Sequence, residues 1–241
     1  MKILTVISNF NEEGAVGNTI RDIRDNSPLK SDLLVIDNCS SDDSINVIRS
    51  EGADYLIHAV NSGSSAGVIK SALAYAYRYG FDIYCHMDGD NQHLAAELGK
   101  IVLPVLNGEA DVVVGSRFLE DGGFRSSYLR RRGIFLFSCL TTLVTGNRYT
   151  DITSGFRAYN RKAIEFFAGS FRQEIDTITQ LELAMHYAGL RRIEVPVRMR
   201  ARKTGRSEFN FRNTVKFPVY NIIGLLGTVI QNNGFRKKKI L

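Results

Sequence analysis

Short apolar, β-branched segments alternate in the first half of the chain with longer segments whose apolar positions recur at helical spacing. The pattern predicts strands at residues 3–8, 33–38, 55–59, 82–88 and 111–118, and helices at 16–26, 44–52, 66–80 and 95–107. Strands that are apolar throughout and separated by helices are typical of a mainly parallel sheet covered on both faces. We therefore predict an α/β fold.

The second half continues this alternation less regularly. A helix is predicted at 176–190, closed by Gly189, and a strand at 192–199; both could extend the sheet or lie over its open edge. Without repeats or Pro/Gly-rich linkers, the simplest interpretation of the first part is one α/β domain to about residue 160. Including the later elements, we predict a domain at 1–210, followed at 211–241 by an amphipathic basic helical segment that associates with a membrane or a partner.

Composition limits the cellular setting. Of the 241 residues, 44% are apolar, which fits a folded globular protein, and the three scattered cysteines suit a reducing cytosol rather than a disulfide framework or zinc site. We expect no secretory signal, and no segment reaches the roughly 20 apolar residues needed to cross a bilayer. The nearest candidate, 217–230, contains Pro218 and Asn221 and could lie on a membrane.

Charge is distributed unevenly along the chain. The net charge is +6, but from residue 191 onward there are thirteen Lys or Arg against two Glu, which makes this part +11 and leaves −5 for the rest. The asymmetry indicates an anionic partner for the C-terminal part, such as lipid phosphate, a membrane surface or nucleic acid. A merely solvated basic tail explains "RKKK" alone equally well.

Polar side chains follow four of the predicted strands, in "SNFNEE", "DNCSSDDS", "MDGDNQH" and "GSR". Each has an ordinary explanation as a turn or helix cap. Because ligands of open α/β sheets bind beyond the carboxyl ends of the strands, their joint position at one edge favours a functional site.

Motifs of other enzyme classes are missing at this edge. The chain has no G-x-G-x-x-G, no P-loop and no nucleophile elbow, which argues against dinucleotide oxidoreductases, P-loop NTPases and α/β-hydrolases. Asp37, at the end of the second strand, is well placed for a nucleotide's base or ribose.

The pair Asp88 and Asp90 is interpreted as oxygen ligands for Mg²⁺ or Mn²⁺, with Gln92 as a third candidate. His93 is expected to hydrogen-bond near the site, because imidazole matches Mg²⁺ poorly. The other histidines are expected at core or surface positions: His58, His86 and His186.

Seven segments together resemble nucleotide-sugar glycosyltransferases of family 2 with the GT-A fold, of the type of dolichyl-phosphate mannose synthase and bacterial polyprenyl-phosphate glycosyltransferases. They occur in the family's order: "VISNFNEE", "VIDNCSSDDS", "NSGSSAG", "MDGDNQH", "VVVGSRF", "DITSGFRAYNRKAIE" and "IEVPVRMRARKTGRS". The resemblance implies a nucleotide-sugar donor, linked to UDP or GDP, and a polyprenyl phosphate acceptor at the cytoplasmic face of the membrane.

The resemblance also assigns roles to residues of this chain. Catalysis is assigned to Asp88, Asp90 and Arg117, with Asp88, Asp90 and Gln92 holding the metal. Nucleotide-sugar binding is assigned to Ser8, Phe10, Glu12, Asp37, Asn38, Asp88, Gly89 and Arg202. Acceptor phosphate binding is assigned to Arg117, Arg130 and Arg131.

Several positions depart from the family pattern. Ser8 replaces a proline, Asn38 an acid and Cys39 a glycine, so we expect base and ribose recognition to differ. Related enzymes often carry transmembrane helices after this domain, so a membrane partner subunit or a homo-oligomer could supply the membrane contact.

Alternative functions stay open at this point. An enzyme that extends a lipid-linked glycan or modifies a protein would share the donor residues and would need a carboxylate base for a hydroxyl acceptor. A nucleic-acid binder could use the basic segment, but we expect no such partner because no nucleic-acid module or regular stacking aromatics are present.

Overall fold

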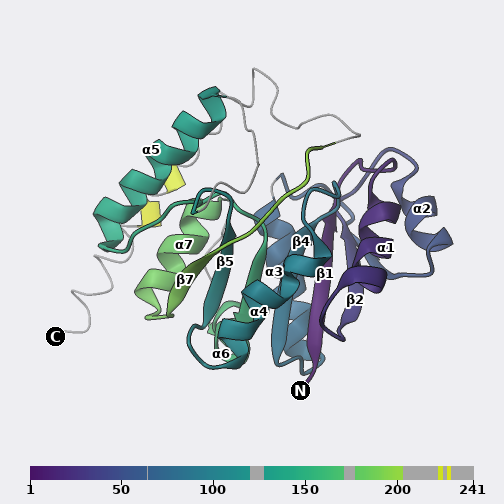
Figure 1. The fold of residues 1–241 in the computed structure, drawn as a ribbon, viewed down its shortest axis with the longest axis horizontal. Helices are drawn as coiled ribbons and strands as arrows, with labels where there is room; N and C mark the ends of the chain where they lie inside the picture. Colours follow the sequence, from purple (N-terminus) through teal and green to yellow (C-terminus); the bar gives the residue numbers. More distant parts are fainter. Residues whose placement is uncertain (64, 120–127, 171–176, 203–221, 225–226, 229–241) are drawn as a thin grey trace.

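Seven strands form one twisted sheet in the order β3-β2-β1-β4-β6-β5-β7 (Figure 1). The strands are β1 (Ile3–Asn9), β2 (Asp32–Asp37), β3 (Asp54–Ile57), β4 (Ile83–Asp88), β5 (Val112–Ser116), β6 (Arg157–Asn160) and β7 (Arg192–Pro196). This computed structural model describes residues 1–63, 65–119, 128–170, 177–202, 222–224 and 227–228. Only β6 runs against its neighbours, so the sheet is mainly parallel, as predicted.

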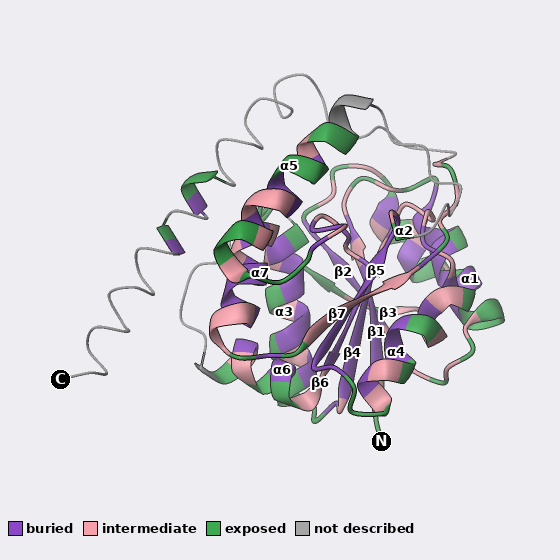
Figure 2. Cartoon of the chain, turned by 60° about the vertical axis from the view of Figure 1, so that its left-hand side comes forward, coloured by how far each residue is buried: buried purple, intermediate pink, exposed green. Residues whose placement is uncertain are grey.

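Helices cover both faces because side chains alternate along the strands. One layer is formed by α1 (Val16–Asn26), α2 (Ser44–Ser50), the 3₁₀ turn η1 (Ala95–Glu97) and α4 (Leu98–Leu106). The other is formed by α3 (Ser65–Arg78), α6 (Arg161–Glu165), the short π-helical turn η2 (Phe166–Ser170) and α7 (Ile178–Tyr187). The inner strands β1, β2, β4, β5 and β6 are largely buried between these layers (Figure 2), whereas the edge strand β3 is mostly exposed and the edge strand β7 is half-buried.

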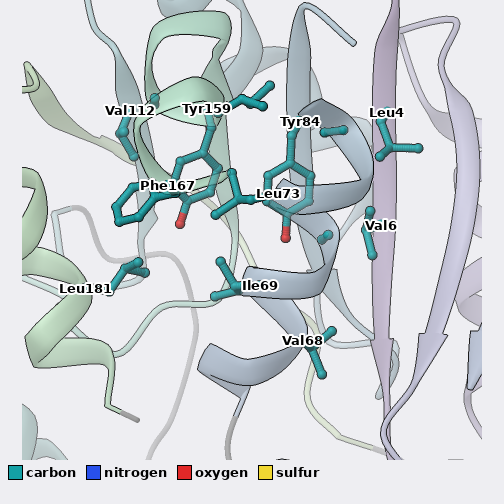
Figure 3. Packing of buried hydrophobic residues seen from close by; sticks show 14 of the residues in the cluster. Leu4, Val6, Val68, Ile69, Leu73, Tyr84, Val112, Tyr159, Phe167 and Leu181 are labelled. Atoms are coloured by element: carbon teal, nitrogen blue, oxygen red, sulfur yellow. The ribbon is translucent and has the colours of Figure 1, made fainter. Parts of the chain in front are cut away.

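The packing of β4 illustrates the alternation. Its Cys85 and Met87 face the layer of α1 and α4, whereas Tyr84 faces α3 and stacks on Tyr159 of β6 with ring centroids 5.2 Å apart (Figure 3). By the two-residue period of a strand, His86 and Asp88 lie on the same side as Tyr84. On this face of β4, Tyr84 and His86 are buried in the core, and Asp88 lies at the end of the strand.

Elements after β5 differ most from the expectations. The helix α5 (Tyr128–Thr145) packs on α7, outside the two layers (Figure 1), and β6 inserts antiparallel between β4 and β5. The predicted strand at 192–199 is β7, and its parallel pairing with β5 extends the sheet. The predicted segment at 211–241 lies outside the described residues except for 222–224 and 227–228.

Parallel pairing brings the polar strand ends together. In register, Ser8 of β1 lies beside Ile36 of β2 and Asp88 of β4, and β5 runs in the same direction because two antiparallel pairings separate it from β4. The four polar segments thus share one sheet edge, as the sequence predicts. None of the helices in the described parts of the chain has the length and apolar character that a membrane span requires.

Candidate active site

Asp88 ends β4, and two imidazoles flank its carboxylate. His93 Nε2 lies 3.1 Å from Oδ2, and His86 Nε2 lies 3.7 Å from Oδ1. Burial alone would raise the pKa of Asp88, but the two histidines hold it well below its usual range. Stacking of His93 on Phe156, with centroids 4.8 Å apart, fixes its ring. Asp88 is therefore an ionised carboxylate held in one orientation, and His93 contacts it, so His93 lies near the predicted site.

Two glycines let the backbone approach this carboxylate. Gly89 donates its N–H to Ser8 O at 2.8 Å, and a Cβ there would lie 3.0 Å from Asn9 Oδ1. A Cβ on Gly155 would lie 2.9 Å from Asp88 Oδ2. A side chain at either position would collide with the strand end.

A second carboxylate pair faces Asp88. Burial raises the pKa of Glu12 to about 7 although Arg202 pairs with it, and the charges of Asp90 and Asp88 contribute. Burial and the charge of Asp88 likewise raise the pKa of Asp90. Arg202 Nη1 lies 3.8 Å from Asp90 Oδ2, so this arginine spans the two acids. The structure thus brings two of the predicted donor-binding residues, Glu12 and Arg202, together with the predicted metal ligands Asp88 and Asp90.

The carboxylates fit a hard cation. Glu12 Oε2 is buried and finds no hydrogen-bond partner among the described residues. Burial is the main cause of the raised pKa values of Glu12 and Asp90, and the negative charge of Asp88 adds to both. No group of three His, Cys, Asp or Glu side chains suited to a metal occurs in the described parts. Mg²⁺ commonly takes only one or two carboxylates and completes its shell with water and substrate phosphate, so Asp88 and Asp90 suffice.

Gln92 is tied to the segment after β7. Its backbone N–H donates to Asp90 Oδ1 at 3.1 Å and its Nε2 donates to Arg200 O at 3.3 Å. Arg200, two residues before Arg202, in turn pairs with Asp22 of α1 at 2.9 Å. A cavity of about 430 Å³ lies beside this pair and is lined in part by Asp90. Most of its other lining residues belong to α1, and no predicted site residue besides Asp90 lines it, so this cavity lies beside the predicted metal site rather than within it.

The end of β2 forms a polar network rather than an open surface. Asp37 is fully buried, and its carboxylate accepts hydrogen bonds from Asn9 Nδ2 at 2.7 Å and from the hydroxyl and N–H of Ser40. Asn38 Oδ1 accepts from Ser62 and contacts His58 Nδ1 at 2.9 Å. Direct base or ribose contact by Asp37 and Asn38 stays a prediction, while Phe10 is half-buried beside them.

Arg117 follows β5 and is held by a buried acid. Its Nε and Nη2 donate to Asp151 at 2.6 and 2.7 Å, and Nη2 also donates to Thr153. Burial would lower the pKa of Arg117, but Asp151 raises it, and the charges of Asp88 and Asp90 contribute. The guanidinium therefore acts within electrostatic range of the acidic pair. Arg131 is exposed on α5, whereas Arg130 lies in the same helix with its side chain outside the described part.

Three contacts at the site were missed by sequence reasoning. His86 was expected at a core or surface position and is fully buried, but its place beside Asp88, where Nε2 lies 3.7 Å from Oδ1, was not foreseen. Asp151 and Arg200 pair with residues far away in the chain, and no local spacing signals such pairs.

Comparison with known proteins gives the family of the chain. The sequence profile described as "Glycosyl transferase family 2" matches residues 5–167, two thirds of the chain. An undecaprenyl-phosphate mannosyltransferase of Micrococcus luteus is 26% identical over 87% of this chain and 88% of its own. A UDP-N-acetylglucosamine–dolichyl-phosphate N-acetylglucosaminyltransferase of Methanococcus voltae is 24% identical over 81% and 84%.

Solved structures agree on the fold. Glucosyl-3-phosphoglycerate synthase of Mycobacterium tuberculosis, in complex with Mn²⁺, UDP and its product, superposes with a TM-score of 0.61 at 16% identity, covering 94% of this chain and 80% of that one. Mannosyl-3-phosphoglycerate synthase of Rubrobacter xylanophilus gives 0.63 at 15%, covering 97% and 75%. The chain thus has the GT-A fold, and it belongs to glycosyl transferase family 2.

Proposed function

We propose that this glycosyltransferase moves a hexose from a UDP- or GDP-linked sugar to a polyprenyl phosphate, with inversion and with a divalent metal, at the cytoplasmic membrane face. The observation that carries the proposal is the meeting of three carboxylates and one buried guanidinium at a single sheet edge. The carboxylates suit a divalent cation, which in turn binds a diphosphate, and the guanidinium suits an anionic acceptor.

On the acceptor side, the chemistry needs no general base. A phosphate monoester has a second pKa near 6, so a lipid phosphate is largely ionised at pH 7 and can attack the anomeric carbon directly. Arg117, held by Asp151, orients this phosphate, with Arg130 and Arg131 of α5 as further cations. In-line attack then inverts the anomeric carbon.

On the donor side, Asp88, Asp90 and Gln92 are the proposed holders of Mg²⁺ or Mn²⁺. When bound, this cation neutralises the departing nucleoside diphosphate. Arg202 spans Glu12 and Asp90 over the same space, and in the proposal it contacts the donor diphosphate. Ser8, Phe10, Asp37, Asn38 and Gly89 form the proposed nucleotide side of the site.

A lipid acceptor fits the surface near Arg131. Phe135 is 71% exposed and Leu143 is 82% exposed on α5, and Arg131 and Arg132 are exposed at the start of the same helix. Apolar side chains next to cations are typical of surfaces that lie on anionic lipid. We propose peripheral attachment there and through residues 211–241, with a membrane partner subunit or a homo-oligomer as additional support. The names of the bacterial and archaeal relatives favour a polyprenyl phosphate acceptor.

The test is transfer of radiolabel from a panel of UDP- and GDP-sugars to polyprenyl phosphate with Mg²⁺ or Mn²⁺. We expect label in the organic phase from one donor, lost on chelation and reduced at least 100-fold in Asp90→Ala. The matched control is Asp32→Ala, an exposed aspartate at the opposite end of the sheet, which should keep wild-type activity. Donor hydrolysis without lipid product, in a preparation with folded protein and added membranes, would contradict the acceptor assignment.

A further inference from the structure

A glutamate on β7 holds the turn that presents Asp151 to Arg117. Glu194 accepts hydrogen bonds from the backbone N–H of Thr150 at 2.9 Å and from that of Asp151 at 3.3 Å. It also accepts from the hydroxyl of Thr150, which in turn contacts Ser116 Oγ at 2.7 Å. One carboxylate thus satisfies two consecutive backbone donors and one hydroxyl of the turn.

Strand register places this carboxylate next to the strand that carries the arginine. Glu194 of β7 lies beside Val114 of β5, and Arg117 follows β5 directly. The turn at 149–151 is therefore bound to both strands, through Glu194 on one side and through Ser116 on the other. A turn held from two sides keeps Asp151 in one position.

Buried charges hold Glu194 in place. Arg192 Nη1 donates to Glu194 at 2.8 Å, and its Nε lies 2.9 Å from Glu182, which also pairs with Arg157 at 2.8 Å. Glu182 and Arg157 are fully buried. Buried ion pairs of this kind resist rearrangement because separating them leaves an uncompensated charge. This network of ion pairs is the rigid base of the turn. Among the described residues, none of its hydrogen bonds or ion pairs involves Asp88 or Asp90.

We infer that Glu194 is a positioning residue for the acceptor anion. It fixes the Thr150–Asp151 turn, Asp151 then fixes the guanidinium of Arg117, and the guanidinium orients the phosphate that attacks. The identity of that anion, a lipid phosphate, rests on the proposed function. In this inference Glu194 itself touches neither the donor nor the acceptor. Small displacements of an orienting group reduce rate because alignment of nucleophile and electrophile is lost.

The kinetic test uses Glu194→Gln in the full chain. The amide keeps the shape but presents one acceptor oxygen in place of two, so the turn loses part of its support. We expect KM for polyprenyl phosphate to rise roughly tenfold, equivalent to about 1.4 kcal/mol, with KM for the nucleotide sugar changed less than twofold. The matched control is Glu165→Gln, which breaks an exposed ion pair on α6 and should leave both constants unchanged.

A second readout needs no acceptor. The Nε–H of Arg117 is protected by Asp151, so its exchange with solvent can be followed by ¹⁵N NMR, with the signal assigned by Arg117→Lys. We expect at least fivefold faster exchange in Glu194→Gln than in wild type or Glu165→Gln. Thr150→Val removes the contacts of the hydroxyl with Glu194 and Ser116 but keeps the backbone hydrogen bonds to Glu194. It should give a smaller change in the same direction, and it serves as the test if Glu194→Gln folds poorly.

The outcomes separate the inference from the proposed function. Faster exchange with a selective rise in the acceptor KM supports both. Faster exchange in an enzyme whose wild type forms no lipid product supports the positioning role and refutes the lipid phosphate acceptor. Unchanged exchange, or equal rises in both KM values with a lower melting temperature, would overturn the inference, because a merely structural glutamate predicts that pattern.

Discussion

Cys39 adopts a left-handed backbone conformation, with φ of +66°, two residues after Asp37, the last residue of β2. This conformation costs a residue with a Cβ roughly 1–2 kcal/mol, whereas glycine adopts it freely. Related enzymes commonly have glycine here. We predict that Cys39→Gly raises the free energy of unfolding by about 0.5–1 kcal/mol, since the greater freedom of the unfolded glycine chain offsets part of the gain. Urea unfolding at pH 7 measures the change.

The control for this substitution is Cys39→Ala. Alanine removes the thiol and its weak contact with Ala59 O but keeps the Cβ and therefore the strain. It should leave the unfolding free energy close to wild type. Equal stability of the glycine and alanine variants would show that the backbone at residue 39 is not strained in solution.

At the same scale, spacing predicted the acidic residues and missed their supports. Asp88 and Asp90 are recognisable because two acids close together at a strand end require a counter-charge. The contact of His86 with Asp88 was not recognisable, because a histidine within "IYCHMD" is expected in the core, where it does lie, and its position beside Asp88 follows only when the strand's period is combined with the end of β4. The pairing of Arg117 with Asp151 depends on how β5 and the turn before β6 meet in space, and no local pattern in either segment encodes it.

The connection between α5 and β6 packs against the carboxylate of Asp88, at the end of β4, through Gly155. A Cβ at Gly155 would lie 2.9 Å from Asp88 Oδ2 and 3.0 Å from Oδ1, so Gly155→Ala must displace either the turn or the carboxylate. We predict at least a tenfold weaker affinity for Mn²⁺ and nucleotide sugar, with a loss of unfolding free energy of about 1–3 kcal/mol as for other overpacked sites. Isothermal titration calorimetry and urea unfolding measure the two effects.

Gly169→Ala is the matched control for Gly155→Ala. A Cβ at Gly169 meets nothing within 4 Å, and this residue is exposed in η2, so binding should be unchanged. Wild-type affinity in Gly155→Ala would mean that the turn moves aside without disturbing Asp88.

Among the elements, the sequence predicted those that follow a regular period. The helix expected at 16–26 agrees with α1, and the five expected strands correspond to β1 to β5 within a few residues. The short strand β6 has only four residues and mixed polarity, so its antiparallel position between β4 and β5 could not be derived from periodicity. The helix α5 begins with three arginines in succession, and its apolar residues are partly exposed, which obscures a buried face.

At the scale of the whole molecule, the structure changes the meaning of the charge asymmetry. Within the basic C-terminal part, Arg192, Arg200 and Arg202 pair with acids of the domain and thus contribute little to an anion-attracting surface. Eight of its thirteen cations lie in 203–241, outside the described residues. The membrane attachment proposed above therefore relies on the charges of that segment and of α5 rather than on those of strand β7.

Internal ion pairs also determine how the whole molecule responds to acid. Burial alone would raise the pKa of Asp151, but Arg117 lowers it, and Arg200 and Lys162 similarly lower the pKa values of Asp22 and Asp111. A carboxylate with a depressed pKa stabilises the fold at pH values above its unfolded pKa of about 3.9 and loses this contribution as pH falls below it. We therefore predict a steep loss of unfolding free energy below about pH 4.

Asp151→Asn tests the contribution of the buried pair of Arg117 and Asp151 to this response. The amide leaves Arg117 buried beside a neutral partner, so we expect a loss of about 3–5 kcal/mol at pH 7. Because the variant can no longer gain a proton at this position, its unfolding free energy should fall less than that of wild type between pH 5 and pH 3. Urea unfolding at several pH values measures both effects, with Asp32→Asn, an exposed site at the start of β2, as the control. Parallel pH curves for wild type and Asp151→Asn would show that the acid sensitivity arises at other carboxylates, such as Asp22 and Asp111.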